Sequence, residues 1–140
     1  MARVYVSSTY RDLVKHREHV RLALQRLHVD DVAMEASVAE EDRSVDTCLA
    51  DVRSCDLYIG IVAWRYGHVP PGHDRSITDL EYRAAGEAGV DRLIFLLDEA
   101  TPWPPPFIER GRAGSRLRRF RKELSERHTC GVFTTPDELG

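Results

Sequence analysis

The sequence has few cysteines and no long apolar run. Its three cysteines, Cys48, Cys55 and Cys130, are odd in number and form no C-x-x-C pair, which argues against a disulfide framework and against a structural zinc site. Reduced thiols are typical of cytoplasmic proteins. No apolar run approaches the roughly 20 residues that span a bilayer, and the first residues lead directly into a strand pattern without a secretory signal. We therefore expect a cytoplasmic protein with no membrane partner.

The sequence also lacks a strong excess of either charge. Its 140 residues carry a formal net charge of -3, which gives no general attraction for nucleic acid or for an anionic membrane. The length fits one domain, which we place at residues 1–134. The run Thr135-Pro136-Asp137-Glu138 has a hydroxyl cap, a first-turn proline and an acid three residues after the cap. We interpret residues 135–140 as the start of a helix that leads into a C-terminal region of a longer protein.

Five apolar segments alternate with helical patterns. They are residues 3–6, 32–34, 57–63, 93–97 and 132–133. The segments at 57–63 and 93–97 are almost wholly apolar, as expected for strands that are covered on both faces. Strands that alternate with helices indicate β-α-β units, a parallel sheet and right-handed crossovers. We predict an α/β, flavodoxin-like three-layer fold with a five-stranded parallel sheet in the order 2-1-3-4-5 and helices on both faces.

The helix expected over residues 76–89 carries an acid on its apolar side. At about 100° per residue, Glu81 falls roughly 40° from Ile77, among alanines and Leu80, whereas Asp79 and Tyr82 fall on the opposite side. A carboxylate on an apolar face must be paired, reach solvent or face a cavity. Because buried acids that face a cleft are enriched at functional sites, Glu81 is the leading catalytic candidate. The alternative is a glutamate that pairs with an arginine at the edge of the core.

A second group of candidates lies where a ligand of such a sheet would bind. Open α/β sheets bind ligands beyond the carboxyl ends of the strands, where the strand order reverses, here between the first and third strands. The two loops there offer Ser7, Ser8, Thr9, Arg11, Trp64, Arg65 and Tyr66. Hydroxyls at a helix start and arginines suit phosphates, and the aromatic rings suit a base. A nucleotide pocket and a purely structural set of caps and turns both remain open.

Two other patterns favour a solvated surface. His16 and His19 lie three residues apart on an expected helix, and no third metal ligand accompanies them. A basic run later in the chain comprises Arg116, Arg118, Arg119, Arg121 and Lys122. For that run a solvated face is favoured, ahead of a protein interface and of nucleic acid. We expect no metal.

Three stretches resemble one family. They are V-Y-V-S-S-T-Y-R-D-L at residues 4–13, the run that ends in I-V-A-W-R-Y-G at residue 67, and S-I-T-D-L-E-Y at residues 76–82. They are similar to an uncharacterised TIR-like family found N-terminal to STAND or NACHT-type ATPases and to tetratricopeptide arrays. The resemblance implies a TIR-like fold over nearly the whole chain. It also implies that residues 37–43 match the loop through which TIR domains self-associate.

The same resemblance implies a role for Glu81. The family is related to TIR domains and to nucleoside deoxyribosyltransferase-like folds, in which a glutamate near the third helix serves cleavage of an N-glycosidic bond. That role carries onto Glu81 alone. The W-C-x-x-E motif of enzymatic TIR domains is absent, because the run here is Thr78-Asp79-Leu80-Glu81. Many TIR domains are adaptors, so the fold does not by itself establish catalysis.

Together these features favour an effector domain of a bacterial STAND-type immune receptor that cleaves NAD when it oligomerises. NAD or a related nucleotide would be the substrate, and no separate cofactor is expected. The other partners would be further copies of this domain and the ATPase and sensor domains of the same longer chain. One alternative is a non-catalytic homotypic interaction module, with Glu81 in a salt bridge. The other is a sensor of a nucleotide signal, which would keep the pocket without needing Glu81.

Overall fold

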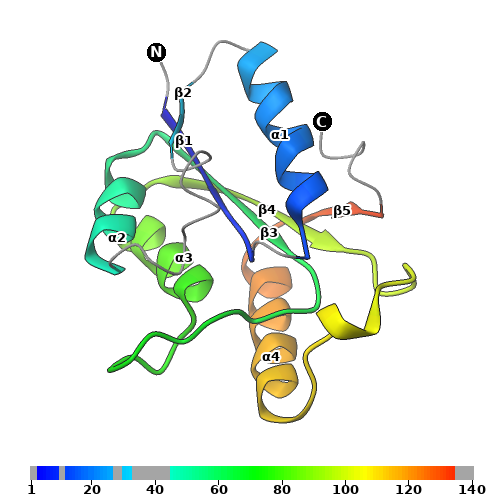
Figure 1. Cartoon of the computed structure of the whole chain (residues 1–140). Helices are drawn as coiled ribbons and strands as arrows, with labels where there is room; N and C mark the ends of the chain where they lie inside the picture. Colours follow the sequence, from blue (N-terminus) through cyan, green and yellow to red (C-terminus); the bar gives the residue numbers. More distant parts are fainter. Residues whose placement is uncertain (1–2, 10–11, 27–29, 33–44, 135–140) are drawn as a thin grey trace.

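The computed structural model describes residues 3–9, 12–26, 30–32 and 45–134, and these form a parallel sheet with helices on both faces (Figure 1). The strands are β1 (Arg3–Ser7), β2 (Asp30–Val32), β3 (Leu57–Val62), β4 (Asp91–Leu97) and β5 (Gly131–Phe133). The helices are α1 (Val14–Arg26), α2 (Val45–Ser54), α3 (Ile77–Glu87) and α4 (Gly111–Arg127), with a 3-10 turn, η2 (Pro105–Phe107). The strands pair in parallel in the order β2-β1-β3-β4-β5, so the α/β class and the strand order agree with the prediction.

Most strand boundaries differ from the prediction by one or two residues, and helix α4 differs by more. The described second strand, Asp30–Val32, begins two residues before the predicted segment 32–34, because backbone pairing with β1 joins Arg3 to Asp30 and so includes aspartates of low strand preference. Residues 33 and 34 of the prediction lie outside the described part of the chain. Helix α4 begins at Gly111 rather than at Ser115. Gly114, one residue before the expected start, is buried, so this first turn already packs against the body of the protein.

The sheet separates two apolar cores. Side chains alternate along β3, so Tyr58 and Val62 face one core while Ile59 and Ile61 face the other. The first core is covered by α2, α3 and α4, and the second by α1, which lies apart from the other three helices in Figure 1. The carboxyl ends of β1 and β3 therefore lie between layers that hold them on both sides.

Arg121 fastens α4 to the carboxyl ends of the central strands. Its guanidinium donates hydrogen bonds to the carbonyls of Val62 (3.3 Å), Ala63 (3.0 Å) and Leu97 (2.6 Å). It also lies over the Trp64 ring, 4.6 Å from the ring centre. The prediction of a solvated basic face is therefore wrong for this residue, which is 7% exposed. The rigid five-donor fork of arginine can satisfy several strand-end carbonyls at once, which a sequence pattern does not show.

Helix α3 is covered on two sides rather than one. Asp79 and Tyr82, predicted to lie opposite the apolar stripe, are both buried. The Tyr82 ring packs edge-on against Phe120 of α4 at 5.7 Å, and its hydroxyl lies 2.7 Å from Nε2 of His128. Helix periodicity finds the side that faces the sheet, but here α4 creates a second buried side.

His16 is buried, so the prediction that it lies on a solvated face is wrong. Its ring packs 5.3 Å from Phe133 and 5.6 Å from Trp103, measured between ring centres. Neither ring nitrogen has a hydrogen-bond partner within the described part of the chain. Burial, helped by the charge of the nearby His19, lowers the pKa of His16.

This burial predicts a loss of stability in mild acid. Because the folded protein binds a proton at His16 less readily than the unfolded chain does, lowering the pH below the ordinary histidine pKa of about 6.5 favours unfolding, by at most about 1.4 kcal/mol per pH unit. His16→Phe should remove this contribution between pH 7 and 5, as measured by urea denaturation. The exposed-site control His73→Gln should retain it. If the free energy of unfolding has the same pH dependence in wild type and in His16→Phe, the buried His16 is not the source of the acid sensitivity.

Candidate active site at the end of strand β1

Glu81 points from α3 into the layer between the helix and the sheet. Helix α3 begins after Ser76, whose hydroxyl caps it by accepting a hydrogen bond from the Asp79 backbone amide at 3.2 Å. One turn later the Glu81 side chain has 0% exposed surface. Its carboxyl group accepts hydrogen bonds from the Tyr5 hydroxyl and from Ser7 Oγ, the latter at 2.9 Å. Glu81 thus faces the sheet, as helical spacing predicts, and contacts Tyr5 and Ser7 of strand β1.

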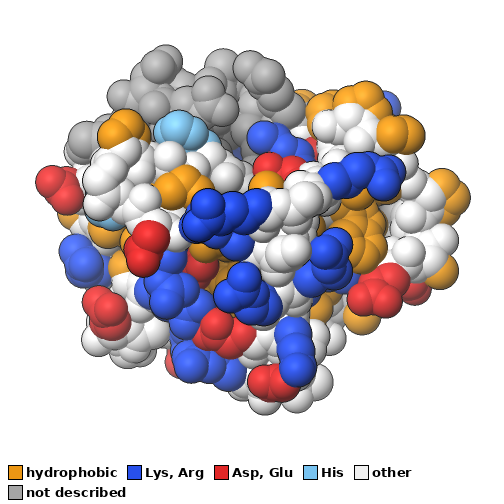
Figure 2. Space-filling model, turned by 90° about the horizontal axis from the view of Figure 1, so that it is seen from below, with side chains coloured by type: hydrophobic (Ala, Val, Ile, Leu, Met, Phe, Trp, Pro, Cys, Tyr) orange, Lys and Arg blue, Asp and Glu red, His pale blue; other side chains and the backbone are white. Residues whose placement is uncertain are grey.

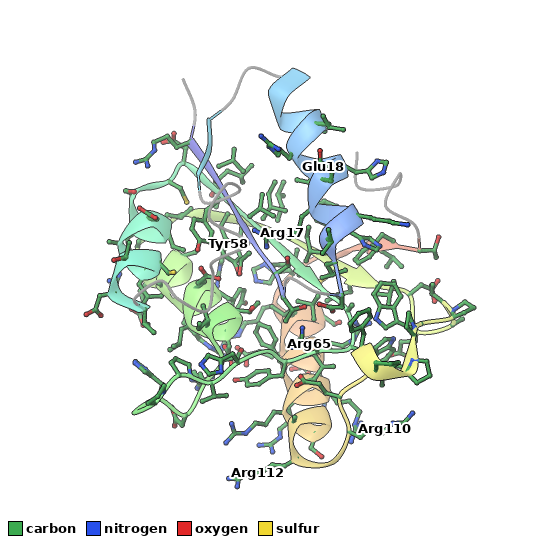
Figure 3. The ribbon with its side chains drawn as sticks, in the orientation of Figure 1. Arg17, Glu18, Tyr58, Arg65, Arg110 and Arg112 are labelled. Atoms are coloured by element: carbon green, nitrogen blue, oxygen red, sulfur yellow. The ribbon has the colours of Figure 1, made fainter. Side chains whose placement is uncertain are left out.

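Two tyrosines complete the surroundings of this carboxyl group. Tyr5 and Tyr58 are paired in the β1–β3 register, and their rings stack with centres 6.5 Å apart and planes 5° apart. Burial raises the pKa of Tyr58 well above its ordinary value, and the charge of Glu81 adds to this. Figure 3 places Tyr58 on the side of the sheet that α2 and α3 cover. Neither tyrosine was among the predicted site residues, which lie in the loops after the strands, although residues 5 and 7 of one strand share a face.

This cluster has the chemistry of a preorganised acid site. Each oxygen of the carboxyl group receives one hydroxyl hydrogen bond, which fixes its orientation. Hydrogen bonds to an ionised acceptor are stronger than neutral ones, and burial strengthens the electrostatic effect of a charge on nearby groups. A carboxylate held in this way can stabilise a positive charge that develops beside it. It lies at the β1–β3 seam, where ligands of open α/β sheets bind.

Ser8 is tied into the protein rather than presented as a free hydroxyl. It is fully buried, its Oγ receives a hydrogen bond from Nη1 of Arg17 at 2.7 Å, and it donates to the Thr9 carbonyl at 2.9 Å. Arg17, which lies near the end of β1 in Figure 3, was not among the predicted site residues. Ser8 therefore fixes the path of the chain after β1.

Thr9 and Arg65 come together through Asp12. The Thr9 hydroxyl donates to Oδ1 of Asp12, and Nη1 of Arg65 lies 3.6 Å from the same oxygen. Burial raises the pKa of Asp12, against the opposing effects of Thr9 and Arg65. The other Asp12 oxygen is buried without a hydrogen-bond partner in the described ranges. Asp12, which was not among the predicted site residues, joins the two loops that were expected to meet.

Trp64 and Tyr66 form a wall beside these loops. The Tyr66 hydroxyl donates to Asp79 at 2.5 Å, and its ring meets Phe120 edge-on at 6.0 Å. Burial, with Asp79 beside it, raises the pKa of Tyr66 to about 12. Trp64 carries the Arg121 guanidinium on its ring. Both rings thus hold α4 in place, and a role in stacking on a base stays a prediction.

Some predicted residues lie outside the described part of the chain. These are Arg11, the segment 37–43 that matches a self-association loop, and residues 135–140. Within the described residues, no group of three or more His, Cys, Asp or Glu side chains is arranged to hold a metal ion. None of the helices there is long and apolar enough to cross a membrane.

Comparison with known proteins identifies similar sequences. A family model described as a domain of unknown function, DUF4062, matches residues 3–140. Telomerase protein component 1 of Mus musculus is 25% identical over an alignment of 167 residues that takes in 89% of this chain. The protein of the same name from Rattus norvegicus is 27% identical over the same share. The chain spans only 6% of the length of each of these relatives.

A solved structure has a similar fold. The CMP N-glycosidase of Clostridium botulinum superposes with a TM-score of 0.51, over 98% of this chain and 95% of that protein, at 18% sequence identity. At this identity the likeness concerns the fold. The CMP N-glycosidase therefore has an arrangement of layers and connections similar to the one described above.

The Glu81 cluster predicts an energetic coupling between α3 and β1. Tyr5→Phe removes a hydroxyl donor from a carboxyl group with no exposed surface, so it should lower the free energy of unfolding by about 1–3 kcal/mol. In a Glu81→Leu background the same change should cost less, with a coupling of at least about 0.5 kcal/mol in a double-mutant cycle followed by urea denaturation. Tyr82→Phe, on the other side of α3, should cost the same in both backgrounds. Strict additivity of Tyr5→Phe and Glu81→Leu would contradict the coupling.

Proposed function

The chain belongs to the DUF4062 family, and from its buried glutamate at the end of β1 we propose that it is an N-glycosidase domain that hydrolyses the bond between the base and the ribose of a nucleotide. The observation that carries this proposal is the Glu81 carboxyl group, oriented by Tyr5 and Ser7 where the sheet changes strand order. The similarity in fold to a CMP N-glycosidase supports the reaction class.

The substrate that we propose is NAD, cleaved between nicotinamide and ribose. The C1′–N bond breaks with its electron pair passing to the nicotinamide nitrogen, and a water oxygen then bonds to C1′ and releases a proton. The products are nicotinamide and ADP-ribose. The ribose passes through an oxocarbenium-like state, as in other glycoside hydrolyses, and the negative charge of Glu81 would stabilise it. Arg11 or Arg65 would hold the pyrophosphate, Ser7 and Thr9 would line the ribose side, and Ser8 would fix the path of the loop that carries them.

The biological setting that we propose is a TIR-like effector of a STAND-type immune receptor, active only when several copies assemble. The 0% exposure of Glu81 supports a need for activation, because a substrate must reach a carboxyl group that other atoms now cover. Assembly of copies by a sensor domain of the same longer chain would rearrange that cover. The isolated domain should therefore be nearly inactive.

A non-catalytic interaction module is the second candidate. Trp64 and Tyr66, the rings expected to stack on a base, are occupied by Arg121 and Asp79 within the protein. In this view the Glu81 cluster is a polar tie between α3 and β1, and the domain acts by binding other copies of itself. A sensor of a nucleotide signal is the remaining alternative, in which binding would not depend on Glu81.

The proposal predicts a separation of activity from stability in one variant. Glu81→Gln keeps the size of the side chain and one accepting oxygen, and its amide NH2 can donate to the second hydroxyl oxygen. The variant removes the negative charge, so NAD cleavage by artificially clustered protein should fall at least about a hundredfold. The melting temperature should change little. Nicotinamide release and thermal unfolding are the two measurements, with Glu87→Gln at the exposed end of the same helix as the control.

The two candidates give different results in this experiment. For the interaction module, wild type has no turnover to lose, so Glu81→Gln and wild type differ at most in melting temperature. Unchanged NAD turnover in Glu81→Gln would rule out the catalytic role of this residue.

A further inference from the structure

A cavity of about 410 Å³ lies between the loop before α3 and helix α4. Its walls come from that loop, from α3 and from α4. Five arginines line it, Arg75, Arg83, Arg112, Arg116 and Arg119, together with three acids, Asp74, Asp79 and Glu123. Figure 2 views this end of the molecule and shows Lys and Arg side chains gathered around a few acidic ones. The cavity is thus positively lined on a chain whose net charge is -3.

One arginine and two acids form a fixed wall of this cavity. Arg83 makes two hydrogen bonds to the Glu123 carboxylate, one of them at 2.7 Å, and its Nε donates to Asp79 at 2.9 Å. Asp79 also receives the Tyr66 hydroxyl. These contacts join α3 to α4. The hydrogen bonds to Glu123 raise the pKa of Arg83, burial opposes this, and the charges of Asp79 and Glu123 raise the pKa further. Arg75 also lies 3.4 Å from Asp79, and Arg127 lies 3.4 Å from Glu123, so both acids are paired with arginines other than Arg112, Arg116 and Arg119.

Three arginines of α4 remain available to a ligand. Arg112, Arg116 and Arg119 form no ion pair with any carboxylate in the described part of the chain. They follow one another at spacings of four and three residues, so they share one side of the helix. Figure 3 shows Arg112 at the N-terminal end of α4. Arg75, 3.4 Å from Asp79 and largely exposed, stands on the opposite rim.

This arrangement does not serve the stability of the helix. Like charges at spacings of three and four residues repel one another, and a cation in the first turn opposes the positive end of the helix dipole. Helix α4 has no acid in its first turn and no side-chain cap at Arg110. An anion bound in the cavity would relieve both the repulsion and the unfavourable dipole, which is the pattern of a ligand site rather than of an optimised surface.

The cavity is separate from the Glu81 cluster. Asp79 and Glu81 are two residues apart on α3, which places their side chains about 200° apart around the helix axis. Asp79 faces the cavity and α4, whereas Glu81 faces Tyr5 and Ser7 of β1. A ligand in the cavity would therefore not contact Glu81 in this arrangement.

We propose that this cavity binds a small molecule through an oligophosphate group, with Arg112, Arg116 and Arg119 as its principal contacts. Guanidinium forks match phosphate oxygens in pairs, and several of them favour a group with more than one phosphate. The exposed Asp74 beside the cavity disfavours an extended polyanion such as nucleic acid, which would pass close to this carboxylate. The proposal does not depend on Glu81 or on any catalytic activity.

The test is calorimetric titration of the 140-residue chain with inorganic pyrophosphate in about 0.15 M salt. At this salt concentration, interactions between charges more than about 8 Å apart are largely screened. Wild type should bind one equivalent. The double variant Arg116→Gln/Arg119→Gln should raise the Kd at least about tenfold. The matched variant Arg118→Gln/Lys122→Gln changes the same helix and the same charge at exposed positions outside this cavity, and it should stay within about twofold of wild type.

Three results would overturn the proposal: no saturable binding of pyrophosphate by wild type, equal weakening in both double variants, or tighter binding of a short single-stranded oligonucleotide that the Arg116/Arg119 variant abolishes. A parallel titration with ADP identifies the source of the phosphates. Equal affinity for ADP and pyrophosphate indicates recognition of the oligophosphate alone, and tighter binding of ADP indicates a nucleotide. Binding of pyrophosphate should be unchanged in Glu81→Gln, so the proposed function can fail without affecting this result.

Discussion

A carboxyl group with no contact with solvent is the constraint on which the centre of this domain depends. Glu81 cannot remain buried without polar partners, because desolvation of an unpaired carboxylate costs several kcal/mol. Its hydrogen bonds to Tyr5 and Ser7 therefore fix the rotation of α3 about its axis and its distance from β1. With α3 held in this way, Asp79 and Tyr82 face α4, and α4 meets the ends of β3 and β4 through Arg121.

The polar contacts of the domain thus form a path from the sheet to the surface. Glu81 joins α3 to β1. Tyr66 of the preceding loop binds Asp79 of α3, and Arg83 of α3 binds both Asp79 and Glu123 of α4. Arg121 joins α4 to the strand ends. Of these contacts, those of Arg121 lie at the carboxyl ends of β3 and β4, where backbone carbonyls of a parallel sheet need partners. The same end carries the proposed catalytic glutamate and, on the other side of α3, the arginine-lined cavity. The polar groups that close the sheet are also those that create its binding surfaces.

The sequence predicts the parts of this structure that follow from periodicity. Alternating strand and helix patterns predict the parallel sheet, and the position of Glu81 among alanines predicts that it faces the sheet. Periodicity along one helix cannot reveal a second covering layer, which is why Asp79, Tyr82, His16 and Arg121 are buried against expectation. Tyr5 and Tyr58 escape notice because buried strand tyrosines look like ordinary core residues. Only the β1–β3 register, a tertiary property, brings their rings together beside the glutamate.

The account's central claim is that the Glu81 cluster cleaves an N-glycosidic bond, and product analysis of clustered wild-type protein tests it most directly. The domain, brought together on a multivalent scaffold, is incubated with NAD, and nicotinamide and ADP-ribose are quantified by chromatography over time. The account predicts that the two products accumulate in equal amounts and that the isolated domain forms far less of either. NAD that stays intact in the clustered sample over many hours, with the fold verified by its thermal transition, would contradict the claim and favour an interaction module.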